Sequence, residues 1–197
     1  MIWLECFPLL LIKKPRPKVY VAETPLIRSM KIGLISDTHG FLDPKVFSYF
    51  EHCDEIWHAG DIGTLELLDE LNDFKPTHAV WGNIDGHKIR EATPEDLLLR
   101  RSGKVFLMTH IAGKPPSYNK RVRDLLDQHQ PDVLICGHSH ILKVEMDKKR
   151  NVLFMNPGAA GRHGFHKVKT LLRFDVADNT LKNLEVVELG PRARVKS

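Results

Sequence analysis

Three strand-like runs alternate with helix-like segments between Met30 and Asp85, and this alternation limits the fold more than any other feature of the sequence. The runs occupy residues 32–37, 55–61 and 78–85. Apolar residues at helical spacing follow the first two runs, at 44–51 and 65–71, and Thr64 is suited to cap the second helix. Alternating strands and helices of this kind predict βαβ units and a parallel sheet.

The second half of the sequence changes rhythm and predicts a further sheet. Two apolar runs flank Ser102–Gly103 as in a β-hairpin, a loop with two prolines follows, and residues 121–130 have the apolar spacing of a helix. The remaining strand-like runs lie at 133–136, 142–147, 151–155, 168–176 and 180–189. No clear helix separates the last four, so we expect a second sheet packed on the first. The predicted fold is α/β, a two-sheet mixed β-sandwich flanked by helices.

Side chains that bind metals follow five of these strand-like runs. They are Asp37 and His39, Asp61, Asn83 with Asp85, His110, and His138 with His140. In open α/β sheets, ligands bind at the carboxyl ends of the strands, so these residues stand where a reactive site forms. A single Asp-x-His after a strand is also an ordinary turn with a capping aspartate. Metal-binding side chains at five successive strand ends favour a shared site.

The chemistry of these donors indicates divalent metal ions. Carboxylate, amide and imidazole groups bind Mn²⁺, Fe, Zn²⁺ or Mg²⁺, and no cysteine thiolate is among them. One catalytic ion takes about three or four protein donors and keeps positions open for water and substrate. Seven of the residues, with Asp85 left aside, exceed that number. Two ions that share one bridging carboxylate account for it.

These motifs resemble those of the calcineurin-like metallophosphoesterase superfamily. Asp37-x-His39, Gly60-Asp61, Gly82-Asn83-x-Asp85, His110 and Gly137-His138-x-His140 occur in the order and approximate spacing of that family. The compact length and Asn156-Pro157-Gly158 are most similar to its small bacterial and archaeal phosphodiesterases, over about residues 31–189. The resemblance implies a four-layer α/β/β/α fold and a dinuclear-metal-dependent phosphodiesterase.

The resemblance also implies a role for each donor. Asp37, His39 and His140 would hold the first ion, Asp61 would bridge, and Asn83, His110 and His138 would hold the second. A hydroxide or water held between the ions would attack phosphorus in line, and the ions would offset charge on the phosphate oxygens. Manganese is the expected metal, with Ni, Fe, Zn and Mg as alternatives. The expected substrate is a small phosphoester.

The sequence departs from many relatives at the residue that protonates the leaving group. Larger members often have histidine directly after the metal-binding asparagine, and Ile84 stands in that place. Diesters and activated esters need less help from an acid than monoesters with poor leaving groups do. His87 is a candidate substitute, although a histidine on a surface loop is the more common role. Asp85 is expected to orient its neighbours.

Further residues near the motifs have weaker assignments. His58 and Asn156 are expected to support the donors or to be structural. Candidate contacts to the phosphate lie in a glycine-rich loop: Arg162, His163 and His166. After His110, residues 111–113 replace the glycine and histidine that many small relatives have, so a different substrate rim is expected.

The chain is expected to form one domain with an extension at each end. Residues 30–190 form the expected metallophosphoesterase domain, residues 1–29 an N-terminal extension that is poorly ordered or loosely packed, and residues 191–197 a basic C-terminal tail. The apolar run at 3–12 is about half the length of a membrane helix, so no membrane partner is expected. Its basic cluster follows the run, whereas a secretory signal carries its charge first, and a signal peptide is therefore the less favoured alternative.

The net charge of +4 is concentrated at the ends of the chain. Residues 1–30 and the tail after Gly190 each carry +3, and the body between them carries −2. A basic groove for nucleic acid is therefore not expected. The three cysteines form neither a disulfide framework nor a zinc ribbon, which favours a reducing compartment and a cytoplasmic location. A homodimer and a homotetramer are both open.

Two other functions share these motifs. The retromer coat subunit, which the domain also resembles, is a non-catalytic scaffold that binds partners through its surface. The intact metal donors of this chain weigh against that role. Nucleases also share the superfamily motifs, and the near-neutral body of the chain weighs against a nuclease.

Overall fold

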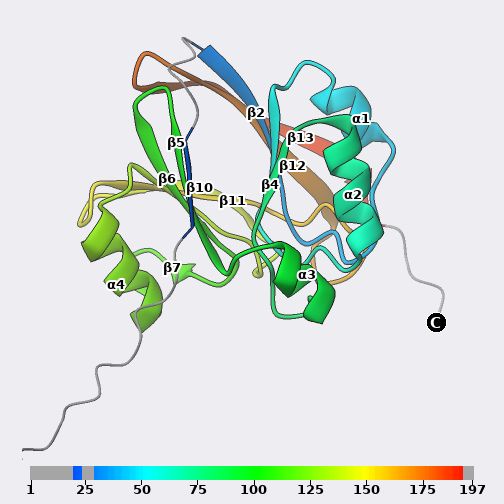
Figure 1. The fold of residues 1–197 in the computed structure, drawn as a ribbon, viewed down its shortest axis with the longest axis horizontal. Helices are drawn as coiled ribbons and strands as arrows, with labels where there is room; N and C mark the ends of the chain where they lie inside the picture. The colour runs from blue at the N-terminus through cyan, green and yellow to red at the C-terminus, as the bar shows by residue number, and fades with distance from the viewer. Residues whose placement is uncertain (1–19, 24–28, 193–197) are drawn as a thin grey trace, which may run out of the picture.

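The computed structural model describes residues 20–23 and 29–192 (Figure 1). Its helices are α1 (Lys45–Phe50), α2 (Leu65–Phe74), α3 (His87–Ala92) and α4 (Lys120–His129). Its strands are β1 (Tyr20–Glu23), β2 (Ser29–Ile35), β3 (Glu55–His58), β4 (Thr77–Ala79), β5 (Asp96–Arg101), β6 (Lys104–Thr109), β7 (Gly113–Lys114), β8 (Ser117–Tyr118), β9 (Val133–Ile135), β10 (Leu142–Asp147), β11 (Val152–Pro157), β12 (Val168–Ala177) and β13 (Thr180–Pro191).

The first sheet has the strand order β13-β12-β2-β3-β4. Strands β2, β3 and β4 are parallel, with α1 and α2 as the connections between them, as the alternation in the sequence predicts. Strand β12 lies antiparallel against β2, with Leu172 opposite Leu34, and β13 forms a hairpin with β12. The last two strands therefore complete the first sheet. The expectation that they belong to the second sheet is wrong, because pairing between segments so distant in sequence has no local signal.

The second sheet has the strand order β1-β5-β6-β9-β11-β10. Its β5–β6 hairpin is the predicted one, with the turn at Ser102–Gly103. Strand β9 is parallel to both β6 and β11, and β10 is antiparallel to β11. Inside the loop expected after His110, β7 and β8 form a small separate hairpin. The mixed two-sheet prediction is thereby confirmed.

The apolar side chains form three layers that hold the sandwich together. Between the sheets lies a cluster that includes Trp57, Phe106 and Phe174, whose rings are 4.8–6.2 Å apart between centroids. A second cluster joins α1 and α2 to the outer face of the first sheet, and a third joins α4 to the outer face of the second. Figure 1 shows the resulting order of helix, sheet, sheet and helix, which confirms the four-layer fold.

The helices begin where their capping residues predict. The Thr64 hydroxyl accepts a hydrogen bond from the Leu67 N–H at 3.2 Å, and the Asn119 side chain accepts one from the Val122 N–H at 2.9 Å. Helix α3 has six residues and a single buried one, Ile89, too few for a periodic signal in the sequence. Among the described helices, none has the length and apolar character that crossing a membrane requires.

Part of the predicted N-terminal extension belongs to the second sheet. Residues 20–23, expected to be poorly ordered or loosely packed, form β1 and pair in parallel with β5, with Tyr20 opposite Leu97. This corrects the prediction for these four residues. The exposed edge of β5 has backbone N–H and C=O groups that an adjacent extended segment can pair. The other predicted features of the extension, at 1–19 and 24–28, lie outside the described residues, as do residues 193–197 of the basic tail.

Candidate metal centre

Six of the predicted metal donors converge on one end of the sandwich. Asp37 and His39 follow β2, Asp61 follows β3, His110 follows β6, and His138 and His140 lie between β9 and β10. The donor atoms form two groups, each with its atoms within 4.8 Å of one another. One group is Asp37, His39 and His140, and the other is Asp61, His110 and His138. The family resemblance implies the same first trio and the same pairing of His110 with His138, but it assigns Asp61 to both ions and adds Asn83 to the second.

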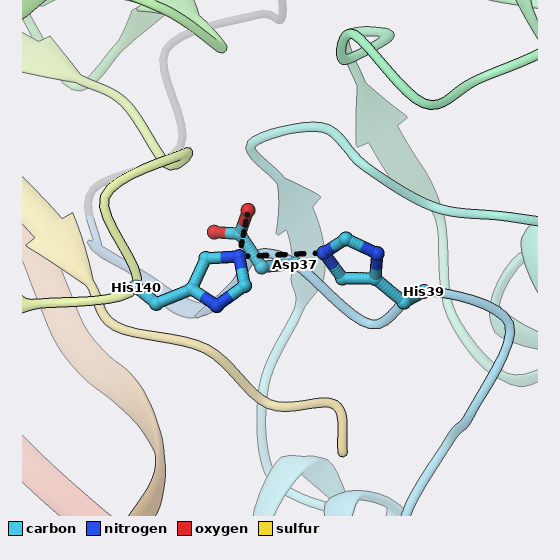
Figure 2. Close-up of side chains that lie close together, drawn as sticks. All are labelled: Asp37, His39 and His140. Carbon is cyan, nitrogen blue, oxygen red and sulfur yellow. Dashed lines mark hydrogen bonds and ion pairs between the residues drawn. The ribbon is translucent and has the colours of Figure 1, made fainter. Parts of the chain in front are cut away.

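In the first group, two imidazoles and a carboxylate face one another (Figure 2). His140 Nε2 lies 3.2 Å from Asp37 Oδ1 and 3.3 Å from His39 Nε2. Asp37 is fully buried, and its carboxylate accepts a hydrogen bond at 3.1 Å from the backbone N–H of His138. That bond connects Asp37 to the loop that carries His138 and His140.

In the second group, His110 presents an unsatisfied nitrogen to Asp61. Its Nδ1 donates to the Ala59 carbonyl at 2.7 Å, so Nε2 carries the lone pair of the neutral ring. This Nε2 is buried without a hydrogen-bond partner, 3.2 Å from Asp61 Oδ1. A buried lone pair that faces a carboxylate is unfavourable unless a cation or a proton lies between them. The arrangement therefore fits a bound cation.

The Asp61 carboxylate lies between the two groups. Its Oδ1 faces His110 of the second group, and its Oδ2 lies 3.6 Å from His39 Nε2 of the first. The backbone N–H of Ile84 donates to Oδ1 at 3.0 Å and fixes the orientation of the carboxylate. The two oxygens of this one carboxylate therefore face both donor groups.

The electrostatics of the centre keep its ligands ready for a cation. Burial would raise the pKa of Asp61, but the adjacent imidazole of His110 outweighs this effect and the pKa is lowered. Burial lowers the pKa of His39, against the charges of the two carboxylates, which favours the neutral, metal-binding ring. Burial also opposes a charge on His110, yet the pKa of His110 is raised because Asp61 and Asp37 favour a proton there.

Five of the six donors have a left-handed backbone. The φ angles are 53° at Asp37, 48° at His39, 56° at Asp61, 68° at His138 and 57° at His140. Such conformations are uncommon for residues other than glycine and cost about 1–3 kcal/mol each. Backbone hydrogen bonds between neighbouring loops hold them, including His39 N–H to the Asp61 carbonyl at 3.0 Å. Repeated strain at successive ligands is typical of a functional site.

Asp85 organises the loops around the donors. Its buried carboxylate accepts hydrogen bonds from the backbone N–H groups of Ile62, Gly63 and Gly82, at 3.1, 2.8 and 2.7 Å. These bonds join the loop after β3 to the loop after β4, the positioning role expected for Asp85. A chemical role for Asp85 in the reaction remains a prediction.

Asn83 lies on the same loop beside the second group. It lines a cavity of about 120 Å³ together with His110 and Ile111. Arg90 of α3 donates to the backbone carbonyls of Asn83 and Asp85, at 3.2 and 2.6 Å, and stacks on Trp81 with 4.4 Å between its guanidinium carbon and the ring centroid. The sequence carries no signal for this role of Arg90, because it depends on a short helix that the apolar pattern does not reveal.

His58 and Thr38 join the loop after β2 to the loop after β3. His58 Nδ1 accepts from the Gly60 N–H at 3.2 Å, so its Nε2–H donates to the Thr38 hydroxyl at 2.9 Å, which in turn donates to the Ile62 carbonyl at 3.0 Å. Burial lowers the pKa of His58 to about 4, so the ring is neutral. His58 is thus a supporting residue, as expected.

Asn156 supports the loop that holds His138 and His140. Its side-chain amide donates to the Gly137 carbonyl at 2.8 Å and to the Ser139 hydroxyl at 3.1 Å. This is the supporting role that the sequence predicts for Asn156.

The glycine-rich loop borders the first group. The His163 ring is 5.7 Å from that of His39 and the His166 ring 5.4 Å from that of His140, measured between centroids. The guanidinium carbon of Arg162 lies over the Phe41 ring, 3.6 Å from its centroid. The loop therefore lies at the rim of the centre, and contact of its side chains with phosphate remains a prediction.

His87 points away from the expected acid position. Its side chain is 84% exposed at the start of α3 and lies 3.1 Å from Glu91, one turn further along the helix. The helix turns the imidazole to solvent, although only one residue separates His87 from Asp85. Its role as the leaving-group acid remains a prediction.

Replacing Gly82 with alanine is expected to disrupt the centre, because an added Cβ would lie 2.0 Å from Asp61 Oδ1 and 2.3 Å from the Asp61 backbone nitrogen. We expect a loss of about 1–3 kcal/mol of stability and a loss of at least about tenfold in metal affinity. Thermal unfolding and metal titration measure both effects. Gly86→Ala is the matched control, since its Cβ would meet nothing within 4 Å. Equal metal affinity in the two variants would contradict the close contact with Asp61.

Comparisons with known proteins agree with this geometry. The sequence model of the calcineurin-like phosphoesterase superfamily domain matches residues 30–179. A probable metallophosphoesterase of Methanocaldococcus jannaschii is 35% identical over 136 residues, which cover 66% of this chain and 68% of that protein. A solved archaeal phosphodiesterase superposes with a TM-score of 0.65 at 23% identity, over 81% of this chain and 100% of that one.

The fold is shared with a further solved protein. Vps29 of Entamoeba histolytica, solved in complex with Zn²⁺, superposes with a TM-score of 0.62 at 18% identity, over 82% of this chain and 99% of that chain. At such identities the likeness shows the fold alone. The family model matches most of the sequence, including all the strand-end donors. This chain therefore belongs to the calcineurin-like phosphoesterase superfamily, among its small prokaryotic members.

Proposed function

We propose that this protein is a dinuclear-metal-dependent phosphodiesterase that hydrolyses phosphoesters by in-line attack of water. The observation that carries the proposal is the pair of donor groups on either side of Asp61, with the buried, unpartnered Nε2 of His110 facing that carboxylate. The membership of the superfamily supplies the reaction class, hydrolysis of phosphoesters by proteins that use divalent metals.

Each group is suited to one divalent ion. Asp37, His39 and His140 would hold the first ion, Asp61 would contact both, and Asn83, His110 and His138 would complete the second. When bound, two such ions lower the pKa of water and offset the charge that develops on phosphate oxygens. The buried carboxylates orient the histidines, and the backbone bonds to Asp37 and Asp61 keep these positions constant during turnover. Manganese is our proposed metal.

The chain has few candidates for protonating the leaving group. Ile84 supplies no proton, and its backbone N–H is engaged with Asp61. His87 faces solvent beside Glu91. A reaction without a positioned acid favours substrates whose leaving alcohol is already acidic. This supports diesters and activated esters over unactivated monoesters.

Turnover of three substrates by the manganese-loaded protein tests the proposal. We expect hydrolysis of a bis-aryl phosphodiester to exceed that of an aryl phosphomonoester, with cyclic nucleotides as the third arm, and elemental analysis to find two ions per chain. Because His87 faces solvent, we expect His87→Ala to change no rate by more than about twofold. A general acid typically contributes about 10²–10⁴-fold, so the two cases are easily distinguished. A selective loss on poor leaving groups would establish His87 as the acid. A monoester preference would contradict the diesterase proposal.

The structural likeness to Vps29 fits the second candidate, a non-catalytic scaffold. The two converging donor groups of this chain favour the enzyme. A metal-loaded protein that is inert toward every phosphoester would favour the scaffold. A nuclease remains the third candidate, and a DNA mobility shift that weakens with salt would support it.

We propose the cytoplasm as the location. Both described cysteines, Cys53 and Cys136, are unpaired and buried. Burial raises the pKa of Cys53 to about 11 and that of Cys136 to about 12, so both remain protonated thiols. Buried thiols without a disulfide fit a reducing compartment. Assembly as a homodimer or homotetramer remains a prediction.

A further inference from the structure

Exposed apolar side chains surround the metal centre. The described residues include eight large apolar side chains that are exposed to solvent, and four of them lie next to residues of the centre. Ile84, Ile111 and Ile141 directly follow three donors, Asn83, His110 and His140, and Phe165 lies within the loop that borders the first group. Their exposed fractions are 45%, 38%, 65% and 103%. We call these four residues the apolar rim.

The apolar rim comes together only in the folded protein. Its members follow β4, β6 and β9 or precede β12, and the donors next to them in sequence converge in the folded chain. Ile84 is hydrogen-bonded to Asp61 through its N–H, and Ile111 lines the same cavity as Asn83. Single exposed apolar residues are ordinary on protein surfaces, but several around one opening mark a binding surface.

Basic side chains accompany the most exposed member of the rim. Arg162 and Lys167 are exposed on either side of Phe165, and residues 148–174 contain no aspartate or glutamate. Arg192 donates to the backbone carbonyls of Arg162 and His166, at 3.2 and 3.1 Å, which holds a further cationic residue against this same loop. An aromatic side chain between cations is typical of surfaces that bind anionic lipid interfaces.

The cavity beside the second donor group is small. At about 120 Å³ it is far below the roughly 300 Å³ at which pockets for drug-sized ligands begin. A long acyl chain would need more space than this cavity offers. A chain attached to the phosphoester would have to stay outside, against the apolar rim.

We propose that the opening of the metal centre is the face that contacts an anionic lipid surface, and that the substrate is a phosphodiester carried by a lipid. Hydrolysis would add water across one P–O bond and release an alcohol and a phosphomonoester. This hydrolysis rests on the proposed function, whereas the contact with lipid does not. The proposal replaces the expectation of no membrane partner, since it requires contact with a surface and no spanning helix.

Vesicle sedimentation without added metal tests the contact. We expect the full-length protein to sediment with phosphatidylglycerol vesicles and much less with phosphatidylcholine vesicles. The double variant Ile141→Ser/Phe165→Ser should lose about tenfold or more in partitioning, the effect of removing large apolar side chains from such an interface. Met146→Ser is the matched control, because Met146 is 52% exposed on β10 outside the rim. An unchanged unfolding temperature confirms that each variant is folded.

Three results would overturn the lipid contact. In the first, wild-type protein stays in solution with both kinds of vesicle. In the second, the double variant binds vesicles as well as wild type does. In the third, light scattering shows that wild type is a dimer and the double variant a monomer. The last would make the rim an interface between two copies. With manganese added, sedimentation without cleavage of either lipid or soluble diester would leave the contact standing and remove the proposed function. Cleavage of soluble diester without sedimentation would support the proposed function and remove the lipid contact.

Discussion

Replacing Asp61 with alanine is expected to lower phosphodiester turnover by about 10³-fold or more, the scale at which loss of a key electrostatic group acts. Asp61 is 2% exposed, and its two oxygens face histidines of different donor groups, at 3.2 and 3.6 Å. Replacing Asp61 with alanine removes both contacts at once. The variant should therefore lose one of its two ions, or both, as well as its activity.

The Asp61 experiment needs metal content and turnover to be measured on the same preparation. Elemental analysis counts ions per chain, and a bis-aryl phosphodiester at saturating Mn²⁺ reports activity. Asp69→Ala is a matched control, because Asp69 is an exposed aspartate on α2. We expect the control to keep two ions and full turnover. An Asp61→Ala protein with unchanged metal content and turnover would remove Asp61 from the bridging position.

Removing metal is expected to abolish turnover and to lower the unfolding temperature. Removing the cations would leave the buried carboxylates of Asp37 and Asp61 in one site without the positive charge that divalent ions would supply. A ligand present at 100 times its dissociation constant adds about 2.7 kcal/mol to the stability of the folded state. For a chain of this size that corresponds to a shift of about 5–10 °C.

Thermal unfolding in chelator and in excess Mn²⁺ measures this stabilisation without reference to activity. His110→Ala should reduce the shift, because the variant loses the nitrogen that faces Asp61. Gly86→Ala should keep the full shift, since an added Cβ there meets nothing within 4 Å. If wild-type protein unfolds at the same temperature in chelator and in Mn²⁺, the two donor groups do not hold metal in solution.

Prediction from the sequence succeeded where the signal is local. The strand-like runs, the Thr64 cap and the hairpin around Ser102 all depend on residues a few positions apart, and the structure contains each of them. Prediction was wrong for β12 and β13, because their place beside β2 depends on pairing between Leu172 and Leu34. The strand in the N-terminal extension was missed for the same reason: it pairs with Leu97 and its neighbours.

The orientations of His87 and Arg90 could not be predicted from their spacing in the sequence. Both lie on α3, a helix of six residues whose single buried side chain leaves no periodic pattern. Spacing from Asp85 suggested His87 as an acid, but the helix turns it toward solvent and Glu91. The same helix directs Arg90 back to the Asn83 carbonyl. Which face of a short helix meets the site is decided by its packing.

The sequence by itself determined the donor chemistry of this protein: carboxylates, an amide and imidazoles at successive strand ends, without a thiolate among them. Only the tertiary structure decided which donors share a group. Asp37 and His140 are 103 residues apart and follow strands of different sheets, yet their side chains lie 3.2 Å apart. Local backbone preference acts over a few residues, whereas this contact requires the apolar faces of the two sheets to pack together around Trp57 and Phe106. Burial of that shared core brings the two halves of the centre into contact.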